Sequence, residues 1–346
     1  MIRYSKQVAQ LTAIAAAAVL AAPAFAATDV SANAEFDTTY LQKNVDRFQQ
    51  GGRIEVNITG KTKVGDGYVA GKGTAILGHG GGASTDDAWV EGGVGGFALR
   101  LGRFEATALA SYPADVFVAG KVGYMGDKLR GRSIGNQDSY VQTDPTDVGV
   151  NGDAHFTLTG DLGGGMAIEF GLVEQNTGSN DGCVTAAPVP PALVGVTTCS
   201  KSPKFGIRPV FKFAAGPVSG AVGFEKSGLS GSKVGLAGTG AFDLGGGASV
   251  GLNLATEGKN GSLGQTKSAT GYGVFGTFGA FNAAVQMGKD HYGNKGNYAY
   301  VEYSMPFFVS PAVFAVAVST GKTPTGSALV GSVKETGIRA RVHYDF

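Results

Sequence analysis

The lengths of the connections in this chain constrain its fold most. Short segments of alternating apolar and polar residues follow one another along the sequence, separated by Gly, Asn, Asp and Pro. The connections alternate between tight turns, such as 65–67 and 95–96, and longer loops, such as 79–85 and 176–203. Tight turns at one end and longer loops at the other are typical of an antiparallel β-barrel that crosses an outer membrane. A soluble β-sandwich has no reason to sort its connections in this way.

The alternating segments number sixteen, and the even number agrees with single-chain bacterial barrels. They lie near 29–41, 52–63, 67–78, 86–94, 96–104, 148–160, 166–175, 204–215, 218–227, 233–244, 247–257, 270–280, 282–291, 297–306, 311–321 and 335–346. Beyond residue 26 the chain has no run of about 18 apolar residues, so a membrane-spanning helix is not expected. In lipid the strands must close into a ring, because the backbone groups of an open edge find no water. The sequence therefore predicts an all-β fold, a closed antiparallel transmembrane β-barrel of about 16 strands.

Glycine makes up 58 of the 346 residues, and a glycine excess of this kind can accompany disorder. The apolar fraction of 43% and the regular alternation argue against disorder here. In the last segment, for example, Ile338 and Val342 alternate with Arg339 and Arg341. We therefore expect residues 27–346 to form a single barrel domain.

Residues 1–26 have the features of a cleaved secretory signal. Arg3 and Lys6 precede an apolar run, and Ala24-Phe25-Ala26 supplies the small residues of a cleavage site. A membrane-anchoring helix is the alternative, but the run is short and Pro23 interrupts its end. Without Arg3 and Lys6, 26 of the 28 basic residues remain against 27 acidic ones, so no nucleic-acid partner is expected.

The longest connection is 105–147, and a loop of this length in a compact domain is unusual unless it has a function. The order of short motifs around it resembles that of the Gram-negative general-diffusion porins. These motifs are the signal, the segment Asp87-Ala88-Trp89-Val90-Glu91, the segment Leu101-Gly102-Arg103 before the long third loop, and Phe346 at the end. The family's acidic Pro-Glu-Phe-Gly-Gly loop motif is absent, and Ser111-Tyr112-Pro113-Ala114-Asp115 lies in the loop instead.

The resemblance implies that 105–147 folds into the lumen as a constriction loop, with acids on the loop and bases on the facing wall. It also implies a homotrimer. In this loop Glu105, Asp115 and Asp127 are the candidate constriction acids, and the alternative is that they are ordinary solvated loop residues.

The alternation assigns seven basic residues to a pore-lining wall, because Arg or Lys facing the lipid midplane costs about 2–4 kcal/mol. They are Arg53, Arg100, Arg103, Arg208, Lys212, Arg339 and Arg341. Arg103 breaks the parity set by Leu99 and Leu101, so it needs a bulge or a position above the bilayer. Tyr298 and Tyr300 fall on the polar phase, where they would stack on sugars or, alternatively, pack against the loop or join an interfacial girdle.

Cys183 and Cys199 are the only cysteines, and a disulfide between them is expected in an exported chain. Two cysteines are too few for a closed zinc site. Asp290-His291 is the only pair suggesting an acid–base dyad, and no nucleophile motif accompanies it, so no enzyme is expected. No cofactor is expected either, and whether calcium binds is not predictable from the sequence.

Together these features predict an outer-membrane porin in contact with lipid and lipopolysaccharide. It would form a water-filled channel for passive diffusion of small hydrophilic solutes and ions. Two alternatives remain open at this point: a solute-selective porin for sugars or anions, and a non-conducting structural or sheath barrel. The inward charged loop favours a pore over a sheath.

Overall fold

The computed structural model describes residues 27–42, 46–104, 106–109, 155–175, 183–185, 197–199, 204–226, 233–259, 266–308, 311–324 and 332–346. The predicted signal, residues 1–26, lies outside this part of the chain. So does most of the predicted constriction loop, of which only 106–109 is described. Within the described residues, no helix has the length and hydropathy that a membrane-crossing helix requires.

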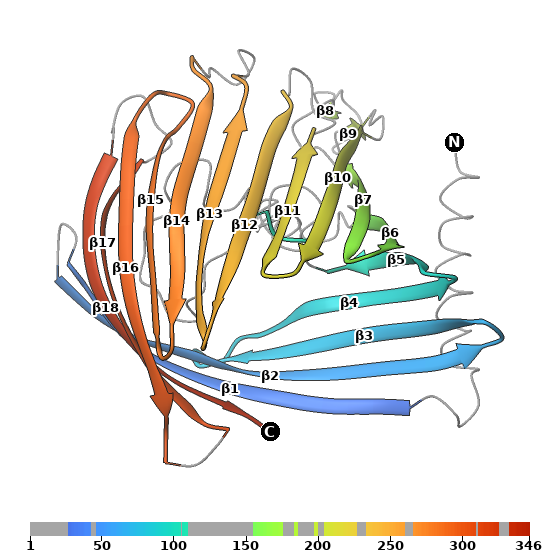
Figure 1. Cartoon of the computed structure of the whole chain (residues 1–346), viewed down its shortest axis with the longest axis horizontal. Helices are drawn as coiled ribbons and strands as arrows, with labels where there is room; N and C mark the ends of the chain where they lie inside the picture. Colours follow the sequence, from blue (N-terminus) through green and yellow to red (C-terminus); the bar gives the residue numbers. More distant parts are fainter. Residues whose placement is uncertain are drawn as a thin grey trace, which may run out of the picture.

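Sixteen described strands form one closed antiparallel barrel, which confirms the predicted fold class. They are β1 (Ala27–Gln42), β2 (Asp46–Val64), β3 (Gly67–Gly78), β4 (Ala83–Val94), β5 (Phe97–Arg103), β6 (His155–Gly163), β7 (Met166–Gln175), β10 (Lys204–Ala215), β11 (Val218–Glu225), β12 (Gly235–Gly245), β13 (Ala248–Glu257), β14 (Ala269–Phe278), β15 (Phe281–Lys289), β16 (Lys295–Pro306), β17 (Val313–Pro324) and β18 (Ser332–Asp345). Neighbours in the sequence are neighbours in the wall, and β18 returns to pair with β1 (Figure 1).

Two details differ from the sequence prediction. The β1–β2 hairpin is longer than expected, because its pairing continues to Gln42 and Asp46. The rings of Tyr40 and Phe48 lie 4.9 Å apart on this extension, and such a cross-strand aromatic pair stabilises pairing. The second difference is a separate two-stranded sheet of β8 (Cys183–Thr185) and β9 (Thr197–Cys199), which the sequence analysis treated as loop.

The tight turns lie where the sequence places them, and glycine makes their geometry accessible. Between β4 and β5, Gly95 and Gly96 have φ angles of 59° and 85°. Two consecutive residues with positive φ are the requirement of a type I′ hairpin turn, which matches the twist of the flanking strands. A side chain at either position would strain the turn.

The outer face of the wall is apolar. Large apolar side chains with more than two-fifths of their surface exposed occur on strands all around the barrel, and examples are Val30, Ile58, Leu99, Val274, Val301 and Ile338. Polar and charged residues alternate with them and face inward, as Arg339 and Arg341 do on either side of Ala340. In water this outer surface would be unfavourable, whereas it suits a band of hydrocarbon.

Two glycines with positive φ angles lie in the wall directly before charged residues, Arg53 and Arg103. Gly52 has a φ of 143°, and a Cβ there would lie 2.2 Å from the Glu35 carbonyl oxygen. Gly102 has a φ of 124°, and a Cβ there would lie 2.3 Å from the Ala88 carbonyl oxygen. Both positions therefore need glycine. Gly102 directly precedes Arg103, but the β4–β5 register continues through both residues without a shift, so no bulge explains the broken parity of Arg103.

Candidate functional site

The interior of the barrel has two unlike walls. The inner face of β18 and β1–β5 carries most of the charged side chains that form ion pairs. The inner face of β11–β17 is built largely from small residues, and Ala221, Ala255, Ala269, Ala284 and Ala317 on it are all buried. The lumen is therefore chemically asymmetric across its width.

Five residues form an ion-pair network where the barrel closes, and we call them the seam cluster: Glu35, Asp37, Glu55, Arg53 and Arg341. Arg341 donates to Asp37 through two nitrogens, at 2.6 Å and 3.0 Å, and its third nitrogen lies 3.6 Å from Glu35. Arg53 lies 3.3 Å from Glu35 and 3.2 Å from Glu55. The two arginines thus face inward as predicted from the alternation, but their carboxylate partners come from the wall itself.

A second charged group lies on β4 and β5, immediately before the long connection. Arg100 donates to Glu91 at 2.8 Å, and the Tyr68 hydroxyl donates to the same carboxylate at 2.7 Å. The Arg100 guanidinium also lies 4.2 Å from the Trp89 ring and 5.3 Å from the Phe104 ring. Cation–π contacts of this length stabilise the side chain in one position. Arg100 is therefore held against the wall by charge and aromatic contact together.

A third group holds the beginning of the long connection, and we call it the Arg208 clamp: Arg208, Glu169, Glu225 and Thr107. Arg208 is 1% exposed and lies 3.4 Å from Glu169 and 3.9 Å from Glu225. It donates to the Thr107 carbonyl oxygen at 2.6 Å, and the Thr107 backbone N–H donates to Glu169 at 3.1 Å. The sequence analysis assigned Arg208 to the pore surface. The structure instead buries it under residue 107.

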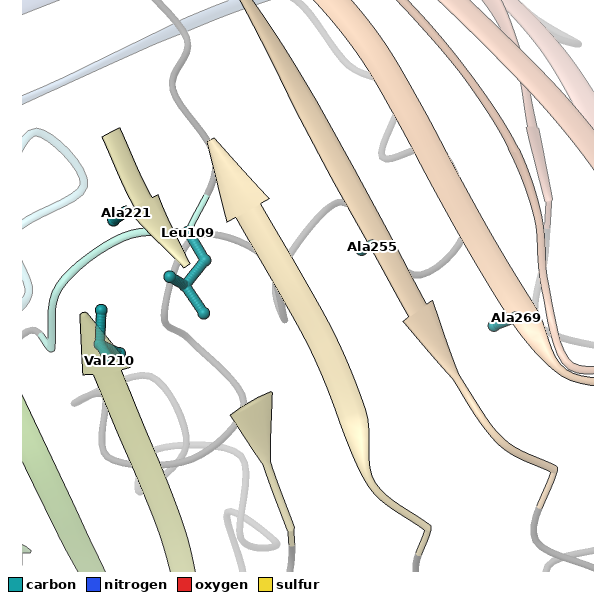
Figure 2. Packing of buried hydrophobic residues seen from close by; sticks show 5 residues of the cluster. All are labelled: Leu109, Val210, Ala221, Ala255 and Ala269. Carbon is teal, nitrogen blue, oxygen red and sulfur yellow. The ribbon is translucent and has the colours of Figure 1, made fainter. Parts of the chain in front are cut away.

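Leu109 continues the contact of this segment with the inner wall. It is 1% exposed and forms a buried cluster with Val210, Ala221, Ala255 and Ala269 (Figure 2). In Figure 2 its side chain lies beside Val210 on β10 and Ala221 on β11. All of these wall residues lie on the inward phase of their strands. The segment that follows β5 therefore enters the barrel, at least as far as residue 109.

The two predicted lumen aromatics, Tyr298 and Tyr300, lie on the inward phase of β16 but are covered. They are 3% and 2% exposed, their ring centroids lie 5.9 Å apart, and they pack with Phe275 and Ala284. A ring with so little free surface has no open face for a sugar. The burial favours packing inside the barrel over stacking on a passing solute.

The remaining predicted residues are placed as follows. Arg339 donates to the Thr39 hydroxyl at 3.0 Å, and Lys212 lies half-buried on the inward phase of β10. The backbone register puts Cys183 directly opposite Cys199 in the β8–β9 sheet, and the disulfide between them stays a prediction. Glu105, Asp115 and Asp127 lie outside the described residues, as does the side chain of Arg103.

The sequence analysis missed the carboxylates of the wall as functional residues. Glu35, Asp37, Glu91, Glu169 and Glu225 all occupy the inward phase of their strands, so the same alternation that selects the arginines could have found them. Within the part of the chain that the structure describes, no group of three or more His, Cys, Asp or Glu residues is arranged to hold a metal ion.

Solved structures of mutants of the Rhodopseudomonas blastica porin are similar to this chain over most of its length. One mutant gives a TM-score of 0.58 at 15% sequence identity, and a triple mutant gives 0.56 at 15%. Each match covers 92% of this chain and 100% of the porin. An engineered protein described by its asymmetric conductivity gives 0.57 at 16%, with the same coverage. No protein-family model and no curated protein matches the sequence. At these identities the likeness establishes a shared barrel fold.

Proposed function

We propose that this chain forms a water-filled channel in an outer membrane, through which small hydrophilic solutes and ions diffuse passively. The observation that carries the proposal is the closed sixteen-stranded wall, apolar outside and charged inside. Barrels of 16 to 18 strands are wide enough to enclose an aqueous channel, whereas eight-stranded barrels are filled by their own side chains. Charged side chains on the inner face keep such a channel hydrated.

The burial of the small-residue wall supports a narrowed channel. Inward-facing Ala255, Ala269 and Ala317 are 8%, 0% and 0% exposed, although residues lining an open lumen would be accessible. Leu109 packs with Ala255 and Ala269, whereas Ala317 belongs to a separate buried cluster with Ala315. We propose that the remainder of 105–147 continues along this wall and narrows the channel. Small side chains suit this role because they leave room for a polypeptide segment.

The location and partners follow from the same surface. The apolar outer band fits lipid hydrocarbon, so we place the protein in the outer membrane with lipid and lipopolysaccharide around it. The homotrimer expected from the family resemblance belongs to this proposal. Catalysis has no part in it.

Conductance of the purified protein in planar bilayers tests the proposal. Discrete steps that scale with salt concentration are expected from a water-filled channel. A non-conducting structural barrel would insert and give no steps. A solute-selective porin would conduct, but one sugar would block the current at low concentration while related sugars would not. Absence of steps from protein that is folded and inserted would overturn the proposed function.

A further inference from the structure

The inward-facing charges of the barrel are unbalanced. On the inward phase of the barrel strands, within the bounds of each strand, the described side chains include fourteen acids and nine bases. The acids are Asp29, Glu35, Asp37, Glu55, Asp87, Glu91, Asp161, Glu169, Glu225, Asp243, Glu257, Glu302, Glu335 and Asp345. The bases are Arg53, Lys61, Lys63, Lys72, Arg100, Arg208, Lys212, Arg339 and Arg341. One or two residues beyond the strand ends, the same phase adds one acid, Asp290, and three bases, Lys233, Lys259 and Lys267. The excess of negative charge is smaller with these residues included, but it remains.

The ion pairs on the inner face neutralise part of this negative charge but not all of it. The seam cluster holds three carboxylates and two guanidinium groups, joined by ion pairs of 3.6 Å or less. In the Arg208 clamp, Glu169 and Glu225 share the single cation of Arg208. Lys72 with Asp87 and Arg100 with Glu91 are balanced pairs. Each of the two larger groups thus contributes net negative charge.

The opposite wall does not cancel this charge. Among the described side chains on the inward phase of β12–β17, the charged ones are Asp243, Glu257 and Glu302, and none is basic. Glu302 is 1% exposed and accepts hydrogen bonds from Asn282 at 2.9 Å and Ser304 at 3.2 Å. Within the strand bounds this wall therefore adds no positive charge that would offset the acids of the seam cluster.

The long connection does not reverse the balance either. From 104 to 154 the sequence contains seven acids, Glu105, Asp115, Asp127, Asp138, Asp144, Asp147 and Asp153, and four bases, Lys121, Lys128, Arg130 and Arg132. Its net charge is negative, so taken as a whole it adds no cationic surplus.

We propose that the channel prefers cations over anions, and that the carboxylates of the seam cluster are specificity-determining residues. The inference rests on the proposed function, because selectivity requires a conducting pore. Rings of acidic side chains select cations in other channels. Fixed charges act on ions within about a Debye length, which is about 10 Å at 0.1 M salt, and a narrowed channel brings every ion within that range. The same field would favour cationic over anionic hydrophilic solutes.

The reversal potential of the parent channel under a tenfold KCl gradient tests the sign directly. Complete selectivity for one monovalent ion corresponds to about 59 mV. We expect a potential of the cation-selective sign that is a fraction of this value. If both KCl concentrations are raised while their tenfold ratio is kept, the reversal potential should become smaller, since the Debye length falls to about 3 Å at 1 M.

Two variants and a control test the assignment to the seam cluster. Glu55→Gln keeps the size of the side chain and removes one carboxylate, so the reversal potential should move toward the anion side. Arg53→Gln removes a cation from the same cluster and should move it in the opposite direction. Asp66→Asn, at an exposed turn residue, changes the net charge by the same amount as Glu55→Gln and should leave the potential near that of the parent.

The outcomes separate the two proposals. Folded, inserted protein that gives no conductance overturns the proposed function. A conducting parent with a zero or anion-selective potential overturns the cation preference alone. Equal shifts of the reversal potential in Glu55→Gln and Asp66→Asn would overturn the role of the seam cluster. If Glu55→Gln does not assemble, Arg53→Gln still tests this role, and a shift of its reversal potential toward the anion side would overturn it.

Discussion

Replacing Arg208 with methionine should release the beginning of the long connection from the barrel wall. Methionine keeps much of the length of the side chain but removes the guanidinium group. Glu169 and Glu225 would then lose a cation at 3.4 Å and 3.9 Å. The Thr107 carbonyl oxygen would lose its donor at 2.6 Å.

The burial of the clamp sets the size of the effect. Arg208 is 1% exposed, and the side chains of Glu169 and Glu225 are 8% and 7% exposed, so water screens the charges little. Removing one partner of a buried ion pair costs about 3–5 kcal/mol, because the remaining charge stays buried. Thr107→Val removes only the hydroxyl hydrogen bond to Glu169, which is worth about 1.5–3 kcal/mol for a charged acceptor. Arg208→Met should therefore be the more destabilising of the two.

Two measurements check this prediction. Guanidinium unfolding in detergent gives the loss of unfolding free energy, and limited proteolysis reports whether 105–154 becomes accessible. Lys212→Met serves as the matched control, because Lys212 lies on the same face of β10 and outside the clamp. A loss for Arg208→Met within the roughly 0–1 kcal/mol of an exposed ion pair, with unchanged proteolysis, would refute the clamp.

Four further predictions follow from the sequence and the fold. Peptide mapping without reductant should find Cys183 and Cys199 joined, and two free thiols in the parent would contradict this. Cys183→Ser should leave conductance unchanged and remove about 3 kcal/mol of disulfide stabilisation from the loop. Gly52→Ala should destabilise the barrel by about 1–3 kcal/mol through backbone strain. Gly60→Ala is the control and should not destabilise it, because the added Cβ meets nothing within 4 Å. Equal melting temperatures of the two variants would count against this account. Deleting 105–147 should raise single-channel conductance, and a deleted barrel conducting like the parent would place the constriction elsewhere. Mass spectrometry of protein from the native membrane should find Ala27 as the first residue, and retention of Met1 would exclude a cleaved signal.

The sequence predicts the barrel well because one physical requirement acts on every strand. Lipid outside and water inside impose the same period of two along the whole wall, and the tight glycine turns mark where it restarts. The short β8–β9 sheet escaped prediction because strands of three residues are too short to show a period.

The interior is less predictable because alternation gives the direction of a side chain but not its depth or its partner. Arg53 and Arg208 occupy the same phase, yet the side chain of one is 41% exposed and that of the other 1%. The difference arises because residue 107 covers Arg208. Likewise Asp37 and Arg341 are 304 residues apart in the sequence, so their pairing requires the register of a closed barrel. No local pattern contains that information.

The pairing of β1 with β18 also determines when this molecule can finish folding. The free edge of β1 can be paired only after β18 has been added, since Ala32 and Phe346 exchange two backbone hydrogen bonds of 2.8 Å across the seam. Until β18 arrives, β1 and β17 each present an unsaturated edge, which in lipid costs free energy at every unpaired group and in water invites aggregation. Closure is therefore a late, long-range event of the kind that folds slowly. A chain truncated before β18 could not close the barrel, because β1 and β17 would both remain unpaired. Loss of this single strand would therefore prevent assembly of the whole barrel and would not merely reduce its stability locally.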